Sequence, residues 1–193
     1  MAGFPPIGIV IAEKVQLYKR KHCTERNAYE CDLPVPVTDW HHPARRVTIR
    51  ETTDLSYATQ IYTDGSKIGR KVEAGVAIYT DKRLVSKCKY KLQYCCSNNQ
   101  AEQIAILKSL ELLPTLEDHN TRSVAIYTDS KVTLDSLKNS SIHRFLTEEI
   151  RSMLGHLTML NWTIHFGWVK AHTRIGGNEV ADKLAQRSCP GSG

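Results

Sequence analysis

The order of apolar and polar residues divides the chain near residue 55. Beyond that point, three apolar runs predict strands at 57–63, 74–80 and 83–92. The third run alternates between apolar and polar residues, as a strand with one solvated face does. Only short polar links separate the three runs, so we expect each strand to return antiparallel to the one before it.

Segments of helical composition follow this three-stranded unit. The stretch 98–113 is rich in helix formers, opens with Asn98 and stops before Pro114, as a helix does. The remaining elements are expected as a strand at 123–127, helices from about 130 and at 145–160, a strand at 161–169 and a helix at 177–187. This order predicts an α/β layer fold with a mixed sheet.

Residues 1–55 have a different character from the rest of the chain. A short basic amphipathic helix is expected early in this segment, whereas Pro34, Pro36 and Pro43 make its later part irregular. We therefore predict an N-terminal extension at 1–55 and one folded domain at 56–190. The apolar run near the start is short and has no basic segment before it, so we expect neither a signal peptide nor a membrane span.

Composition narrows the class of protein only a little. Apolar residues make up 41% of the chain and charged residues 24%, as in soluble globular proteins, and the net charge of +6 permits a polyanionic partner such as nucleic acid. The six cysteines are irregularly spaced, which favours reduced thiols in an intracellular compartment. A zinc site of Cys23, Cys31, His41 and His42 is the alternative, although its gaps are wider than those of compact zinc modules.

The sequence Ile-Tyr-Thr-Asp occurs three times and places an acid after three predicted strands, at Asp64, Asp81 and Asp129. Because the first two strands are expected to run antiparallel, Asp64 and Asp81 belong at opposite edges of the sheet, roughly 20 Å apart. A helical connection commonly returns the chain parallel to an earlier strand. If the fourth strand lies beside the first, Asp129 stands about 5 Å from Asp64, and Asp81 is an exposed turn residue.

Each acid taken alone has an ordinary structural explanation. Asp64 precedes a glycine in a common turn signal, and Asp129 can cap the helix that follows it. Glu102 in a first helical turn suits the helix dipole, and Asp182 can be a surface charge. Two carboxylates within about 5 Å, however, repel each other unless a cation or a proton lies between them. Because hard divalent cations prefer oxygen ligands, such a cluster suits a two-metal site for phosphoryl transfer.

Four motifs, in this order, resemble those of type 1 ribonuclease H domains. They are YTDGS (62–66), SNNQAE (97–102), YTDS (127–130) and WVKAHTRIGGNEVADKLA (168–185). The resemblance covers about residues 55–187 and is strongest to the ribonuclease H domain at the end of non-LTR (LINE-type) retrotransposon polyproteins. The start of the chain resembles the stretch that follows the reverse transcriptase there. This resemblance implies the ribonuclease H-like fold, a five-stranded mixed sheet with helices on both faces.

The resemblance also implies the residues of a catalytic site. The positions that match the family's four metal-binding carboxylates are Asp64, Glu102, Asp129 and Asp182. Two Mg²⁺ ions are the expected cofactors, with Mn²⁺ as a substitute. His172 matches the histidine of a mobile loop that assists proton transfer or product departure, and Gly176 and Gly177 are expected to let that loop flex.

Contacts to the substrate follow from the same resemblance. The positions that match the family's contacts to the RNA strand are Gly65, Ser66, Ser97, Asn98, Asn99 and Gln100. Amides and backbone groups at a helix start can reach the minor groove, where 2′-hydroxyl groups identify the RNA strand. A simple asparagine cap is compatible with the same residues and explains less.

The expected activity is endonucleolytic hydrolysis of the RNA strand of an RNA–DNA hybrid. The expected setting is intracellular, in the nucleus or the cytoplasm, alongside the reverse transcriptase domain of the same polyprotein. Two alternatives stay open: a DNA-acting nuclease or integrase of the same fold, and a non-catalytic nucleic-acid-binding descendant. The SNNQAE motif argues against the first, and the presence of all four acids argues against the second.

Overall fold

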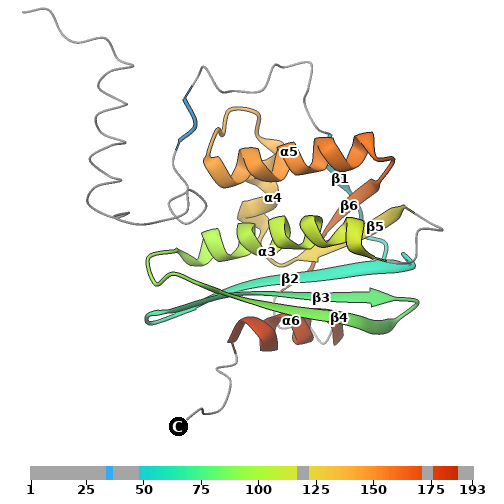
Figure 1. Ribbon diagram of the computed structural model, residues 1–193, viewed down its shortest axis with the longest axis horizontal. Coiled ribbons are helices and arrows are strands. Elements are labelled where there is room, and N and C mark those ends of the chain that lie inside the picture. Colours follow the sequence, from blue (N-terminus) through green and yellow to red (C-terminus); the bar gives the residue numbers. More distant parts are fainter. Residues whose placement is uncertain (1–33, 37–47, 117–121, 171–175, 187–193) are drawn as a thin grey trace, which may run out of the picture.

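The computed structural model describes residues 34–36, 48–116, 122–170 and 176–186 (Figure 1). The expected basic helix near the start of the chain, the alternative zinc ligands and His172 lie outside the described residues. These expectations therefore stay predictions.

A mixed sheet forms the centre of the fold, and the order of its strands is β1-β6-β5-β2-β3-β4. The six strands are β1 (Arg50–Glu51), β2 (Thr59–Ile68), β3 (Lys71–Thr80), β4 (Arg83–Leu92), β5 (Ser123–Thr128) and β6 (Thr163–Trp168). β2, β3 and β4 form an antiparallel meander, whereas β5, β6 and β1 run parallel to β2. The predicted α/β fold with a mixed sheet is confirmed, and β1 adds one strand to the five expected.

The additional strand lies before the predicted boundary at residue 55. Arg50 and Glu51 pair with β6, and the next residue continues the contact, because the Thr52 N–H donates to the carbonyl oxygen of Phe166 at 2.8 Å. The Tyr127 hydroxyl donates to the carbonyl oxygen of Asp54. The segment just ahead of β2 is thus fastened to the sheet, while the division of the chain at residue 55 stays a prediction.

Strand β2 is longer than the expected 57–63. It runs through Asp64 to Ile68 because β3 pairs with it over its whole length, as far as Ile68 opposite Lys71. Asp64 therefore lies within a strand, and the expectation that it ends one was wrong. What ends near Asp64 is the pairing with β5 on the other side.

Helices cover both faces of the sheet, as expected (Figure 1). The helices are α3 (Asn98–Leu112), α4 (Lys131–Lys138), α5 (Phe145–Met159) and α6 (Gly176–Gln186), with a short 3₁₀ helix at Leu113–Thr115. The first three pack above the sheet in Figure 1, and α6 packs below it. Among the described residues, no helix is both long and apolar enough to span a membrane.

The repeated Ile-Tyr pairs build the two cores on either side of the sheet. Successive strand residues point to opposite faces, so isoleucine and tyrosine separate. The isoleucines Ile61, Ile78 and Ile126 pack in the core under α3 and α5. On the α6 face, the ring of Tyr62 stacks on Tyr127 with centroids 5.0 Å apart and meets Tyr79 edge-on at 5.8 Å. The isoleucine of each motif therefore marks the face covered by α3 and α5, and the tyrosine marks the face covered by α6.

Hydrogen bonds from a single arginine hold the connection between α4 and α5. The Arg151 guanidinium donates to the carbonyl oxygens of Ser136, Leu137, Asn139 and Ile142. It also forms an ion pair of 2.6 Å with Glu148, a buried carboxylate that lies 3.1 Å from His143. Since α4 begins two residues after Asp129, this network helps to hold the helix that follows that acid.

We expect Arg151→Ala to lower the free energy of unfolding by about 3 kcal/mol, because it removes the ion pair of the buried Glu148 and the donor to several carbonyl groups. Arg151→Lys should recover only part of this loss, since one ammonium group cannot reproduce a planar fork of donors. Urea unfolding monitored by circular dichroism measures both variants. Arg83→Ala, an exposed position, is the control, and an Arg151→Ala protein as stable as this control would contradict the prediction.

Candidate active site

The parallel register of β2 and β5 brings the first two acids together. Ile61 lies opposite Ile126, Tyr62 opposite Tyr127 and Thr63 opposite Thr128. The next position on each strand is an aspartate, so Asp64 and Asp129 are neighbours at the end of this pairing. Ligand oxygens of Asp64, Asp129 and Glu102 all lie within 4.8 Å of one another. The adjacency expected from strand direction is therefore present, and Glu102 joins it.

Glu102 reaches this point because the start of α3 packs against the backbone of β2. Ser97 and Gln100 form a reciprocal cap, in which the Gln100 N–H donates to the Ser97 hydroxyl at 3.1 Å and the Ser97 N–H donates to Oε1 of Gln100 at 2.7 Å. A Cβ atom on Gly65 would lie 2.3 Å from the backbone nitrogen of Glu102. Only glycine permits this close approach, which sets Glu102 beside Asp64.

Burial and like charge raise the pKa values of two of these acids. The pKa of Asp64 is raised to about 7, mainly by burial and further by the negative charges of Asp129 and Asp182. Burial likewise raises the Glu102 pKa to about 9, with Asp64 and Asp129 as further causes. A hydrogen bond from the Gly65 backbone opposes both shifts. Without a cation, the cluster therefore retains protons near neutral pH.

Asp182 approaches the same acids from the opposite face of the sheet. It lies on α6, partly exposed, and its charge acts on Asp64. The helix packs very close to β3, since a Cβ atom on Gly75 would lie 2.5 Å from the carbonyl oxygen of Ala181. Among the described residues, the group of three acids within 4.8 Å does not include Asp182. The fourth predicted carboxylate is thus near the cluster and at its margin.

Asp81 stands apart, as the strand directions predict. It follows Thr80 of β3, which pairs with Thr59 at the start of β2, whereas Asp64 pairs with Gly75. Six residues of strand separate Asp81 from Gly75, a distance of roughly 20 Å. Asp81 is exposed and forms a tight turn with Lys82, with φ angles of 48° and 65°. Of the three Ile-Tyr-Thr-Asp acids, Asp81 alone is a turn residue.

The glycines expected to loosen a loop lie in a helix instead. Gly176 and Gly177 form the first turn of α6. A Cβ atom on Gly177 would lie 2.2 Å from the ring of Tyr62, so glycine is needed there for helix packing. The helix predicted at 177–187 is therefore confirmed, with its start at Gly176, whereas the expectation that these two glycines let the loop flex was wrong. His172 lies outside them, and its role stays a prediction.

The predicted substrate contacts gather around the start of α3. Ser97 and Gln100 cap the helix, and Ser66 lies in β2 opposite Glu73. The side-chain oxygen of Asn98 accepts from the Lys67 N–H at 3.0 Å, and that of Asn99 accepts from the Thr133 hydroxyl at 3.4 Å. These residues border Glu102 and Gly65, and their binding of RNA stays a prediction.

Two residues beside the site were missed in the sequence. The Lys67 ammonium donates to the carbonyl oxygens of Tyr94 at 3.0 Å and Cys96 at 2.6 Å, which ties β2 to the loop before α3. The Trp168 indole donates to the carbonyl oxygen of Asp129 at 3.0 Å. Trp168 pairs with Thr128 in the parallel register of β6 with β5, which places it next to Asp129. The sequence therefore indicates this neighbour only once the fifth predicted strand is placed beside the fourth.

The three clustered acids fit a divalent metal ion. All of their ligand atoms are carboxylate oxygens, which hard divalent cations prefer. Oε2 of Glu102 is buried and has no hydrogen-bond partner among the described residues, a costly arrangement that a cation would relieve. The structure thus defines the class of site: a cluster of buried acids, suited to a divalent cation, in the middle of a mixed α/β sheet.

Comparison with known proteins identifies the protein family to which this chain belongs. The family model described as RNase H matches residues 56–190, which is more than half of the chain. The chain belongs to the RNase H family. Ribonuclease H of Francisella tularensis subsp. novicida is 28% identical over 139 residues, covering 66% of this chain and 88% of the relative. Ribonuclease H of Ruthia magnifica is 28% identical over 136 residues, covering 65% of this chain and 90% of the relative.

A solved structure shares the fold. The N-terminal RNase H domain of rv2228c from Mycobacterium tuberculosis, solved as a fusion with maltose-binding protein, superposes with a TM-score of 0.52 at 18% identity. The match covers 65% of this chain and 94% of that one. The ribonuclease H-like fold expected from the four motifs is therefore confirmed.

We expect the metal-free protein to lose stability as the pH rises from 5 to 9. The folded pKa values of Asp64 and Glu102, about 7 and about 9, lie above their ordinary values of 3.8 and 4.5. Folding therefore retains protons that the unfolded chain releases, and this contribution is complete below pH 4 and lost as the pH passes 7 and then 9. Thermal unfolding in a chelator, across that pH range, measures the effect.

The comparison that isolates these acids is between the wild type and Glu102→Gln. The variant should flatten the decline, since its amide does not titrate, whereas Asp81→Asn should keep it. Equal slopes for wild type and Glu102→Gln would contradict the raised pKa values. Added divalent cation should stabilise the wild type most at high pH, where the carboxylates are charged.

Proposed function

We propose that this chain is an endonuclease that hydrolyses the RNA strand of RNA–DNA hybrids with two bound Mg²⁺ ions. Membership of the RNase H family supports this activity. The observation that carries it is the set of three carboxylates from β2, α3 and β5, within 4.8 Å of one another. The products would carry 3′-hydroxyl and 5′-phosphate ends.

Asp64 is suited to hold both ions because it interacts with each of the other acids. The charges of Asp129 and Asp182 act on Asp64, and the charge of Asp64 acts on Glu102. Asp182 would complete one ion site, and Glu102 with Asp129 the other. The bound ions supply Lewis-acid stabilisation of the attacking and leaving oxygens of a phosphodiester. Binding of the ions would require Asp64 and Glu102 to release the protons that they otherwise retain.

The groups around the start of α3 would position the RNA strand. Oδ1 of Asn98 accepts from the backbone of β2, and the side chain is exposed. Its amide N–H groups can therefore donate to a ligand. Such donors suit 2′-hydroxyl groups across the minor groove of a hybrid. The close contact of Gly65 with α3 would set the scissile phosphate near Glu102. His172 would assist proton transfer or product departure.

The setting that we propose is a retrotransposon reverse-transcription machinery. The resemblance of the four motifs to LINE-type ribonuclease H domains supports it, together with the weaker resemblance of the first residues to the segment after a reverse transcriptase. The partner would be the reverse transcriptase domain of the same polyprotein, in the nucleus or the cytoplasm. There the activity would remove template RNA after first-strand DNA synthesis.

Hybrid cleavage by Asp64→Asn tests the function directly. We expect activity to fall by more than roughly 100-fold, since even an outer partner of a metal site costs 10- to 100-fold. Asp81→Asn, which removes the same charge from the same sequence motif, should cleave like the wild type. The assay resolves labelled RNA in a hybrid, with Mg²⁺ and with Mn²⁺.

The same assay distinguishes the alternatives. Cleavage of duplex DNA in preference to the hybrid would indicate the DNA-acting nuclease or integrase. Binding of the hybrid without cleavage by the wild type would indicate the non-catalytic descendant. An inactive Asp81→Asn protein that remains folded would contradict the assignment of the site to the β2–β5 end.

A further inference from the structure

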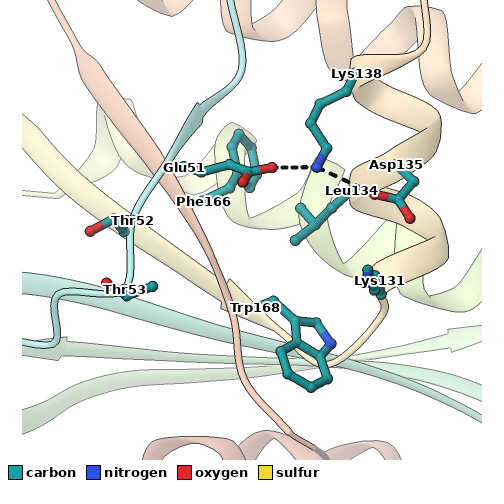
Figure 2. Close-up of a pocket in the computed structure, with 9 residues that line it drawn as sticks. All are labelled: Glu51, Thr52, Thr53, Lys131, Leu134, Asp135, Lys138, Phe166 and Trp168. Carbon is teal, nitrogen blue, oxygen red and sulfur yellow. Dashed lines mark hydrogen bonds and ion pairs between the residues drawn. The ribbon is translucent and has the colours of Figure 1, made fainter.

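A pocket opens beside the candidate active site, between α4, the end of β6 and the segment that follows β1 (Figure 2). Its volume is about 350 Å³, at the lower end of the range of small-molecule sites, roughly 300–1,000 Å³. The side chains that matter below are Thr52, Thr53, Lys131, Lys138, Phe166 and Trp168. Thr52 and Thr53 precede the region 56–190 that matches the family, so this pocket includes residues from outside the family domain.

The pocket is joined to the candidate active site through one carbonyl group. The carbonyl oxygen of Asp129 accepts from the Trp168 indole at 3.0 Å and from the Lys131 N–H at 3.0 Å. These bonds hold the edge of the indole ring in place next to the acid cluster. Trp168 is nevertheless 52% exposed, so much of its side chain remains accessible to a ligand. An exposed, oriented aromatic ring of this kind is a platform on which a nucleobase can stack.

The charges in the pocket are arranged unevenly. Lys138 forms ion pairs with both acids of the pocket, Glu51 and Asp135, and Figure 2 shows these pairs at the end away from Trp168. Lys131 lies two helical turns earlier on α4, roughly 10 Å away. It is exposed, and no ion pair to its ammonium group is found among the described residues. The end of the pocket nearest the acid cluster therefore carries a positive charge available to an anion.

The remaining walls of the pocket supply mainly apolar contact. Phe166 is buried beneath the pocket, and Thr52 and Thr53 stand across from α4 (Figure 2). The segment after β1 is held in place by the backbone bond from Thr52 to Phe166, and the Thr52 hydroxyl accepts from the Asp54 N–H at 3.0 Å. An aromatic platform and a cation together match the base and the phosphate of a nucleotide.

We propose that this pocket binds one unpaired nucleotide of the RNA strand next to the scissile phosphate, with its base on Trp168 and its phosphate at Lys131. This inference rests on the proposed function. The RNA strand is chosen as the ligand because it is the strand that would be cleaved beside Asp129. A base within the duplex is stacked on its neighbours and does not reach the ring. The pocket therefore favours hybrids in which the RNA continues as a single strand beyond the paired region.

Cleavage of paired substrates tests the proposal. Each assay compares a blunt hybrid with the same hybrid carrying a short single-stranded RNA overhang, placed at one end or the other. We expect the wild type to have a KM about tenfold lower for one overhang, the effect of one stacked base. Lys131→Glu and Trp168→Ala should lose this preference. Lys82→Glu, with the same charge change in the distant β3–β4 turn, should retain it.

Three outcomes would overturn the proposal. The first is a wild type without preference for either overhang, and the second is a preference that survives in Lys131→Glu and Trp168→Ala. The third is an equal preference for a DNA overhang, which would assign the pocket to the other strand. Because Lys131 is exposed, its variant should fold, and circular dichroism checks this.

A binding measurement separates failure of this inference from failure of the proposed function. In a chelator, where no cleavage takes place, short single-stranded RNA should quench tryptophan fluorescence of the wild type and of Lys82→Glu. The quenching should be lost in Lys131→Glu, in which Trp168 is still present. Quenching without hybrid cleavage by the metal-loaded protein would support the pocket and contradict the nuclease. Hybrid cleavage without quenching would support the nuclease and contradict the pocket.

Discussion

The parallel register between β2 and β5 is the constraint on which the site depends. Asp64 and Asp129 repel each other, so their adjacency has to be imposed by packing elsewhere. Both strands carry Ile-Tyr-Thr before the aspartate, with isoleucines in one core and tyrosines in the other. A slip of one residue would exchange the two faces and expose both cores. The apolar packing thus stabilises a pair of charges that is unfavourable until a cation binds.

Glycine contacts bring the other two acids to this pair from opposite faces. Gly65 allows α3 to approach β2 from one side, and Gly75 allows α6 to approach β3 from the other. Each contact joins backbone to backbone, so the positions of Glu102 and Asp182 depend little on flexible side chains. Four acids that lie far apart in the sequence thereby share one region, with the most buried pair, Asp64 and Glu102, at its centre.

The central geometry could be predicted from the sequence because it follows from strand direction and from repeated motifs. The full length of β2 could not, since the polar residues before Gly69 resemble a loop and become strand only through pairing with β3. β1 has two residues and therefore no periodicity to detect. The sequence places Gly177 at the start of a helix but does not show why it is glycine, since the cause is the ring of Tyr62, a contact between distant parts of the chain. The bond from Trp168 to Asp129 likewise arises only when β6 is placed beside β5.

The tight turn at Asp81 and Lys82 has a practical consequence. It lies at the tip of the outer hairpin, exposed to solvent, and roughly 20 Å of strand separates it from Asp64. An inserted peptide tag or a coupled dye at this tip would leave the acid cluster at the other end of the hairpin facing the solution. The hairpin is thus a natural handle for immobilising the protein or for attaching an optical label.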